Sequence, residues 1–200
     1  MRKQKKPKHI EMGWLRAEPK PELFSDEYIV LNYDGSQIQQ EAFYRIWMGR
    51  QGTKEEVSNA FSWYFGNVKD CNLKKDLFFV KHGNEYIATV TAIYHQKNNA
   101  GHVHCFAIRD DYRGKRLSYP LMYIAMKKIY DNGADFAYLS TDDWRKPAIK
   151  VYINCGFLPM MNEFWPHKKR KMKARWKNIY NELNLDNFKM LNKKYKPIKV

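Results

Sequence analysis

Six consecutive residues near the middle of the chain have the composition of a phosphate-binding loop: Arg113, Gly114, Lys115, Arg116, Leu117 and Ser118. They lie between an apolar run, 102–108, and a stretch with apolar residues at helical spacing. The first N–H groups of a helix have no partner within the helix, and the helix dipole makes that end positive. A basic loop that opens a helix therefore predicts a phosphate site.

A second motif, residues 148–157, follows downstream. It predicts a helix from 147 to 155 that ends at Gly156, and on this helix Val151 and Tyr152 share one face with Ala148 and Cys155. That face is the apolar one, so the pattern directs a tyrosine towards the sheet.

The elements that must position both motifs follow one α/β order. A strand at 102–108 precedes the loop, and a helix with apolar positions from 117 to 129 follows it. Pro120 falls in the first turn, where its missing N–H costs little. A strand at 136–140 then leads to the second helix.

Upstream, the sequence predicts a strand, two helices and a hairpin. The strand is at 27–31, the first helix at 37–48, and a second, which opens with the capping-box-like segment Thr53 to Glu56, ends near Gly66. The hairpin strands are at 77–80 and 85–94.

At these residues the chain resembles the GNAT superfamily of N-acyltransferases. The phosphate loop of that family follows the pattern Arg/Gln-x-x-Gly-x-Gly/Ala. Arg113 matches its first position, whereas Arg116 and Ser118 stand where the family usually has glycines. The Arg116 side chain could replace the close backbone approach that those glycines allow.

The second signature of the family is Asn-x-x-Ala-x-x-x-Tyr-x-x-x-Gly-Phe. The chain matches it at Ala148, Tyr152, Gly156 and Phe157. Arg145 stands where asparagine is usual. The resemblance covers residues 77–160 well and the helices between 37 and 65 more loosely.

The resemblance implies an α/β (α+β) fold, a GNAT-like mixed, mostly antiparallel sheet with helices on both faces. It implies an N-acetyltransferase that moves an acetyl group from acetyl-CoA to an amine by direct attack in a ternary complex. Residues 113–118 would contact the coenzyme A pyrophosphate and pantetheine. The strand residues Phe106, Ala107 and Ile108 would hold the pantetheine arm and acetyl carbonyl. The alternatives are a solvated basic turn, or a non-catalytic acyl-CoA- or RNA/ribosome-binding module of the same fold.

The resemblance also implies two catalytic side chains. Tyr152 stands where related enzymes use a tyrosine hydroxyl to protonate the departing thiolate, although a core tyrosine would fit the same pattern. His102 stands where several relatives have a glutamate base, and His104 lies on the same face of the strand. Each histidine could instead be satisfied by its neighbours.

Four residues after the strand at 136–140 could meet the acceptor: Asp142, Asp143, Trp144 and Arg145. The carboxylates could hold a cationic amine, and Trp144 could pack on it. Asp143 could equally cap the following helix.

The net charge of +15 is concentrated at the two ends. Residues 1–11 carry five basic and one acidic side chain, and residues 167–200 carry twelve basic and two acidic side chains. Because the excess charge lies at the ends and not around the predicted site, it does not indicate an acidic acceptor. The second end predicts an extra basic helix at 167–183 with an apolar stripe of Met172, Trp176, Ile179, Tyr180 and Leu183. It could contact nucleic acid or the ribosome, or pack on its own domain or on a second copy in a homodimer.

The remaining features favour a single reduced, cytoplasmic domain. The three cysteines form no Cys-x-x-Cys pair, and no metal-ligand spacing occurs. No stretch predicts a membrane span or a signal peptide. We expect a basic arm and loop at 1–25 with the loop around Gly13, the acyltransferase domain at 26–166, and a basic helical extension at 167–200.

Overall fold

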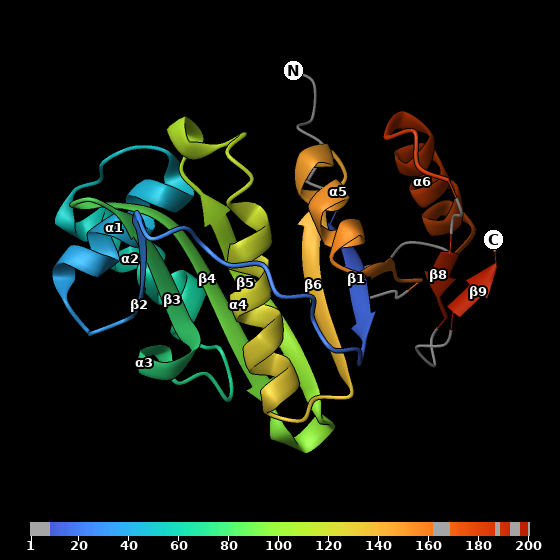
Figure 1. Ribbon diagram of the computed structural model, residues 1–200, viewed down its shortest axis with the longest axis horizontal. Helices are drawn as coiled ribbons and strands as arrows, with labels where there is room; N and C mark the ends of the chain where they lie inside the picture. The colour runs from blue at the N-terminus through green and yellow to red at the C-terminus, as the bar shows by residue number, and fades with distance from the viewer. Residues whose placement is uncertain (1–8, 162–168, 187–188, 193–196, 200) are drawn as a thin grey trace. The chain divides into compact units, whose positions relative to one another are not determined.

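The computed structural model describes residues 9–161, 169–186, 189–192 and 197–199 (Figure 1). The chain divides into two compact units. The central unit comprises residues 16–137, and the terminal unit comprises residues 1–15 and 138–200. Among the described residues, no helix has the length and apolar character needed to cross a bilayer.

Four antiparallel strands form the sheet of the central unit, in the order β2-β3-β4-β5. Their bounds are Tyr28–Asn32 (β2), Leu77–His82 (β3), Glu85–His95 (β4) and Ala100–Ile108 (β5). The four strands that the sequence predicts for this unit are confirmed, and their observed ends differ from the predicted ends by up to two residues. Gly83 and Asn84 alone make the β3–β4 turn, which is tighter than predicted.

A β-bulge interrupts β5. Thr89 pairs with Ala107 and Thr91 with His104, so β5 has one more residue than β4 across this interval. Cys105, inside the bulge, has a φ of 49°. A bulge bends a strand and redirects the side chains that follow it. The last residues of β5 therefore leave the sheet in a direction that a regular strand would not take.

Two helices cover one face of this sheet. Both α1 (Gln37–Met48) and α2 (Lys54–Phe65) start where the sequence predicts them. The Ser36 side chain caps α1, and Thr53 and Glu56 form a reciprocal capping box on α2.

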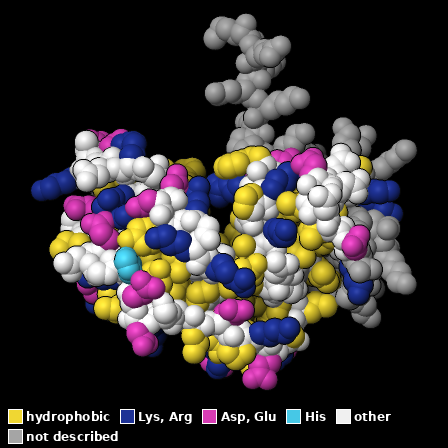
Figure 2. Space-filling model, turned by 45° about the horizontal axis from the view of Figure 1, so that its top comes forward, with side chains coloured by type: hydrophobic (Ala, Val, Ile, Leu, Met, Phe, Trp, Pro, Cys, Tyr) yellow, Lys and Arg dark blue, Asp and Glu magenta, His cyan; other side chains and the backbone are white. Residues whose placement is uncertain are grey.

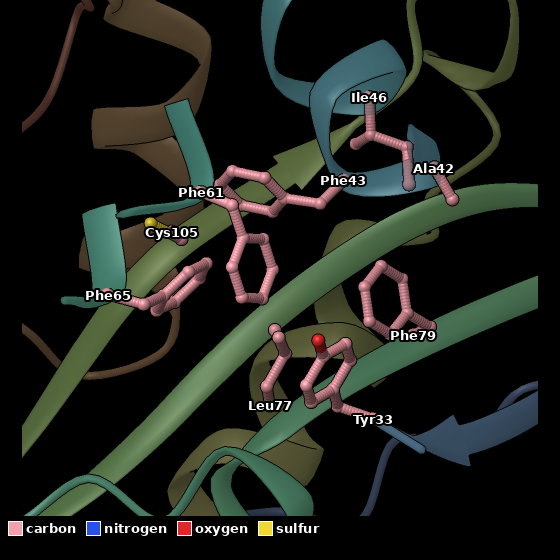
Figure 3. Packing of buried hydrophobic residues seen from close by; sticks show 9 residues of the cluster. All are labelled: Tyr33, Ala42, Phe43, Ile46, Phe61, Phe65, Leu77, Phe79 and Cys105. Carbon is pink, nitrogen blue, oxygen red and sulfur yellow. The ribbon is translucent and has the colours of Figure 1, made fainter. Parts of the chain in front are cut away.

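An aromatic cluster joins these helices to the sheet (Figure 3). Phe43 of α1 lies edge-on to Phe65 of α2, with ring centroids 5.0 Å apart. The other buried members of the cluster are Tyr33, Ala42, Ile46, Phe61, Leu77, Phe79 and Cys105. Burial of such large rings is the main stabilising contribution on this face.

The helix α4 (Ser118–Asp131) covers the opposite face. It packs against β5 at Gly101, where any Cβ would overlap the Ile129 side chain. This close approach explains a glycine inside β5, where the sequence had indicated the break before the strand. Lys128 of α4 also forms an ion pair with Asp76 of the short helix α3 (Leu73–Asp76), which was not predicted.

The segment 16–27, here called the strap, runs along the outside of α4 (Figure 1). Arg16 donates hydrogen bonds to the carbonyls of Tyr130 and Ala134 at the C-terminal end of α4, at 3.2 and 2.8 Å. The far end of the strap leads into β2 beside the N-terminal end of α4. The strap thus spans the whole helix.

The terminal unit begins with a strand that the sequence analysis missed. Residues 9–15, predicted to be arm and loop, form β1 (His9–Leu15). Ile10, Met12 and Trp14 are fully buried at alternate positions, a pattern that we overlooked amid the surrounding lysines and prolines. β1 pairs antiparallel with β7 (Leu158–Pro159).

The other elements of this unit follow the predicted order. Most of β6 (Phe136–Asp142) lies here, next to β1, and α5 (Lys146–Asn154) follows. Gly156 has a φ of 90°, which suits the glycine predicted to end this helix.

The chain then forms α6 (Lys169–Glu182) and an antiparallel pair, β8 (Lys189–Leu191) and β9 (Pro197–Lys199). Residues 167 and 168 of the predicted basic helix lie outside the described residues. The apolar stripe on α6 is buried at Met172, Trp176, Ile179 and Tyr180. An ion pair of 3.0 Å from Arg175 to Asp143 and one of 2.6 Å from Lys146 to Glu182 connect α6 to the rest of this unit. The stripe therefore packs within the chain itself, as one of the alternatives predicted.

Candidate functional site

The basic loop connects the end of β5 to the start of α4, as predicted. A single 3₁₀ turn, Asp110–Tyr112, follows β5, and α4 begins at Ser118. Leu117 occupies the N-cap position, and no side chain caps the helix there. A helix start without a side-chain cap can satisfy its N–H groups with a bound anion.

The loop backbone takes the left-handed conformation twice. Gly114 has a φ of 78° and Arg116 a φ of 61°. This conformation costs a residue with a side chain about 1–2 kcal/mol, but costs glycine almost nothing. Arg116 therefore takes a glycine-like conformation at a position where the GNAT pattern usually has glycine. A Cβ added to Gly114 would meet nothing within 4 Å, so the space above it is open.

Two of the basic side chains near the loop are held by carboxylates. Arg109 pairs in a bidentate manner with Asp111, at 2.7 and 2.6 Å, and also donates to Glu85. These hydrogen bonds raise the pKa of Arg109. Arg113 forms an exposed ion pair of 2.6 Å with Asp110. Arg109 anchors the loop rather than offering charge to a ligand.

Two other basic side chains are not held in this way. In the part of the chain that the structure describes, neither Lys115 nor Arg116 pairs with a carboxylate. Lys115 Nζ lies 4.5 Å from the ring centroid of Tyr112, and Arg116 Cζ lies 5.5 Å from that of Tyr119. Cation–π contacts at exposed sites are weak, about 0.5–1 kcal/mol. Lys115 and Arg116 are thus available for a phosphate.

His82 ties this loop to the rest of the central unit, a link that sequence analysis missed. His82 Nδ1 lies 3.0 Å from the Tyr112 hydroxyl, and Nε2 lies 3.1 Å from Glu27 at the end of the strap. The sequence analysis had placed His82 in a hairpin turn, and no local pattern signals a partner 30 residues away.

Of the three strand residues predicted to hold pantetheine, Phe106 lies in the bulge, and Ala107 and Ile108 directly follow it. Ala107 pairs with Thr89, and Ile108 pairs with Ala88. Phe106, Ala107 and Ile108 are all half-buried. Their contact with a donor stays a prediction.

His102 lies among other histidines inside the central unit. Its ring is 5.2 Å from that of His104 and 6.1 Å from that of His95. Burial, followed by the neighbouring His104 and His95, lowers the pKa of His102 to about 3. His104 Nε2 lies 3.0 Å from the Tyr64 carbonyl, and burial lowers its pKa as well. Both rings are neutral at pH 7, and His102 is a weak base there.

Tyr152 lies in α5 of the terminal unit and is buried. Burial raises its pKa, an effect that the charge of Arg145 partly offsets. Its ring lies 6.3 Å from that of Phe157, the last residue of the second motif. A neutral hydroxyl suits a proton donor, and the packing also suits a core tyrosine.

The carboxylates predicted to hold an acceptor have partners within the terminal unit. Asp142 is buried and forms ion pairs with His9 and Arg145, at 3.1 and 3.4 Å. Asp143 pairs with Arg175, and the N-cap residue of α5 is Arg145. The alternative role of Asp143 as a helix cap was therefore wrong. Trp144 is 65% exposed and lies against the Arg145 guanidinium.

The described residues include no group of three or more potential ligands placed to hold a metal ion. Figure 2 shows lysine and arginine side chains interspersed with acidic and hydrophobic ones on the face that it presents.

Comparison with known proteins agrees with this fold. The model of the Acetyltransferase (GNAT) family matches residues 32–157. This match covers more than half of the sequence, and the chain belongs to the GNAT acetyltransferase family. A search of curated proteins found no match.

Solved structures of the same family share the fold. They include a GCN5-related N-acetyltransferase from Sphaerobacter thermophilus (TM-score 0.57, 14% identity, 76% of this chain and 48% of that one). Another is an acetyltransferase of the GNAT family from Colwellia psychrerythraea, with a TM-score of 0.57 and 13% identity, over 77% of this chain and 53% of that one. A third is a GCN5-related N-acetyltransferase from Kribbella flavida, with a TM-score of 0.50 and 17% identity, over 76% of this chain and 54% of that one. The chain spans about half the length of these structures.

Proposed function

We propose that this protein is an N-acetyltransferase that transfers an acetyl group from acetyl-CoA to an amine. The observation that carries the proposal is the helix start at Ser118, which no side chain caps. Beside it, neither Lys115 nor Arg116 pairs with a carboxylate among the residues that the structure describes. In a member of the GNAT family, this arrangement suits the pyrophosphate of an acyl-CoA donor.

The reaction is a direct attack within a ternary complex. The neutral amine nitrogen forms a bond to the thioester carbonyl carbon, and the carbon–sulfur bond breaks with its electrons on sulfur. The amine proton passes to a base, directly or through water, and the thiolate receives a hydrogen bond or proton. No covalent enzyme intermediate is required.

Tyr152 is the proposed donor to the thiolate. Its raised pKa keeps the hydroxyl protonated at neutral pH. A thiol has a pKa of about 8.5, so full proton transfer from Tyr152 would be uphill, and a hydrogen bond to the thiolate is its more effective contribution.

The base that takes the proton from the acceptor amine has only a weak candidate in this chain. His102 stays a prediction for this role, but a group with a pKa of about 3 accepts a proton poorly at pH 7. Water relayed to bulk solvent is the competing route.

The second candidate is an acyl-CoA- or RNA/ribosome-binding module of the same fold without catalysis. The replacement of family glycines by Arg116 and Ser118 favours it, whereas the family residues retained at Tyr152, Gly156 and Phe157 favour catalysis. Nucleic-acid contact by the basic ends, a homodimer and a cytoplasmic location stay predictions.

One experiment separates the two candidates. Acetyl-CoA at about 100 times its dissociation constant should raise the free energy of unfolding by about 2.7 kcal/mol, and a panel of amines should release free thiol. Stabilisation without thiol release from any amine would favour the binding module. An unchanged unfolding midpoint with saturating acetyl-CoA would contradict both the acetyltransferase and the acyl-CoA-binding module.

A further inference from the structure

The strand β2 lies at one end of the strand order, next to β3, and so forms an edge of the sheet (Figure 1). All five of its residues are uncharged, and none is proline or glycine. Ile29 and Val30 are 52% and 40% exposed, on opposite faces of the strand. Soluble proteins usually protect an edge strand with lysine, proline or a bulge, because an open edge pairs with other chains. β2 has none of these features, so its edge is suited to a partner strand.

The register of β2 with β3 determines which backbone groups face the open side. Tyr33, the residue after β2, donates its N–H to the Leu77 carbonyl at 3.0 Å and continues this register. Hydrogen-bonded pairs alternate along an antiparallel ladder. Tyr28, Val30 and Asn32 therefore direct their N–H and C=O groups away from β3.

Some of these outward groups already have partners within the chain. Tyr28 N–H donates to the Ser25 carbonyl at 3.0 Å, and the Asn32 carbonyl accepts from Gln39 Nε2 at 3.2 Å. In the residues that the structure describes, no partner is found for the Tyr28 carbonyl, the Asn32 N–H or either backbone group of Val30. The open edge thus offers donors at Val30 and Asn32 and acceptors at Tyr28 and Val30.

This set of open groups is complementary to itself. When a second copy of β2 runs antiparallel about a two-fold axis at Val30, each Val30 N–H meets the Val30 carbonyl of the other copy. Each Asn32 N–H then meets the Tyr28 carbonyl of the other copy. The Tyr28 N–H and the Asn32 carbonyl, which would face each other next, are the two groups already satisfied within the chain. We propose that β2 is the interface of a homodimer, in which the sheets of two central units join through their β2 edges.

The side chains of β2 suit this pairing. Val30 lies opposite Val30 of the second copy, and Ile29 lies opposite Leu31. Apolar and β-branched pairs across neighbouring antiparallel strands stabilise a sheet. The pairing removes from water the side chains of Ile29 and Val30 that are exposed in the single chain.

The charges at the two ends of β2 are also complementary. Asp26 and Glu27 precede the strand, and the exposed Lys74 and Lys75 lie beside its other end. The last side chain of β2 donates a hydrogen bond to the Lys75 carbonyl at 3.2 Å, which places α3 at that end. Asp34 lies there too, so the two lysines leave this end with a net positive charge. The two-fold axis brings the acidic start of each strand next to the basic end of the other.

The first test measures the mass of the full chain in solution. Sedimentation equilibrium from micromolar to millimolar protein should show twice the 24.0 kDa mass of the chain, with a micromolar dissociation constant suited to a small interface. Val30→Lys places like charges opposite each other at the axis and should weaken the dimer by about tenfold or more. Trp63→Lys is the control, because it makes the same change at an 83% exposed apolar residue of α2 and should leave the dimer intact.

The second test identifies the residue on the axis. Val30→Glu should weaken the dimer as Val30→Lys does, and an equal mixture of these two variants should associate again. Only a residue that faces its own copy gives this pattern, because the mixture places opposite charges across the axis.

Val30→Pro tests the backbone pairing. Proline removes an N–H that points away from β3, so the ladder within the chain stays complete and the variant should keep its circular dichroism spectrum. The dimer loses the hydrogen bonds at its centre, and the variant should be monomeric.

This interface does not depend on the donor site, and acetyl-CoA binding is measured separately. A chain that stays monomeric up to millimolar concentration would overturn the proposal. A dimer that Val30→Lys and Val30→Pro leave as stable as before would also overturn it, as would a mixture of the two charged variants that does not associate.

Discussion

The Tyr112 hydroxyl lies 3.0 Å from Nδ1 of His82, which joins the start of the basic loop to the end of β3. The other ring nitrogen of this histidine contacts Glu27, so one imidazole connects the loop, the sheet and the strap. The conformation of the loop thus depends on residues far from it in sequence.

His82→Ala should loosen this loop. Loss of these hydrogen bonds should lower the free energy of unfolding by about 1 kcal/mol and weaken acetyl-CoA binding several-fold. Chemical denaturation and calorimetric titration measure the two effects. His95→Gln, which alters a histidine paired with Asp70 at the opposite end of β4, is the control and should leave acetyl-CoA affinity unchanged. Equal affinity in His82→Ala and the unaltered chain would show that the loop does not need this anchor.

Arg116→Gly should separate backbone strain from side-chain charge. Glycine relieves a left-handed conformation that costs about 1–2 kcal/mol but adds about 0.4–1 kcal/mol of unfolded-state entropy, so the free energy of unfolding should rise by about 0 to 1.6 kcal/mol. Affinity for acetyl-CoA should fall, because a phosphate contact is lost. Arg116→Ala should lose the affinity without the gain in stability. Tighter binding by Arg116→Gly would mean that close backbone approach matters more than the arginine.

The two partly buried histidines His102 and His104 should make the fold sensitive to acid. An unfolded histidine has a pKa of about 6.5, whereas the pKa of His102 is about 3 and that of His104 is also lowered. Between these values the unfolded chain binds more protons than the folded chain, so stability falls as pH falls. Each such histidine contributes a slope of at most about 1.4 kcal/mol per pH unit.

Denaturation curves between pH 7 and pH 4 measure this slope. His102→Gln should reduce it, because the variant has one buried imidazole fewer. The same slope in the variant and the unaltered chain would place the acid sensitivity elsewhere.

Tyr152→Phe should lower turnover and leave donor affinity intact. The change removes only the hydroxyl, and loss of one positioned hydrogen-bond donor to a developing negative charge typically costs about 100-fold or more in kcat. Steady-state rates and calorimetric titration with acetyl-CoA measure the two quantities. Tyr180→Phe is the matched control, because Tyr180 is also buried and burial raises its pKa to about 12. Equal turnover in both variants would leave Tyr152 with a packing role only.

His102→Gln tests the predicted base through activity. If His102 accepts the amine proton, the variant should have lower turnover and an altered pH–rate profile with unchanged coenzyme A affinity. His104→Gln gives the comparison for a neighbouring buried histidine. Unchanged turnover in His102→Gln would remove this residue from the mechanism.

Local patterns were sufficient to predict most of the secondary structure. The capping box at Thr53, the apolar spacing of α4 and the glycine after α5 act over a few residues, so their effect can be read without a fold. The same holds for the two motifs that placed the chain in its family. β1 was missed because its alternation spans only seven residues next to a basic, proline-containing segment.

The sequence by itself determined the loop, its place between a strand and a helix, and the class of protein to which it belongs. Only the tertiary structure decided which of its cations are available: within the described part of the chain, Arg109 and Arg113 have carboxylate partners, whereas Lys115 and Arg116 do not. It also decided the low pKa of His102 and the position of the strap beside the loop. The Arg109–Asp111 and Arg113–Asp110 pairs are local, but the pairing of Arg109 with Glu85 and the burial of His102 depend on residues distant in the chain, and no local pattern encodes those contacts.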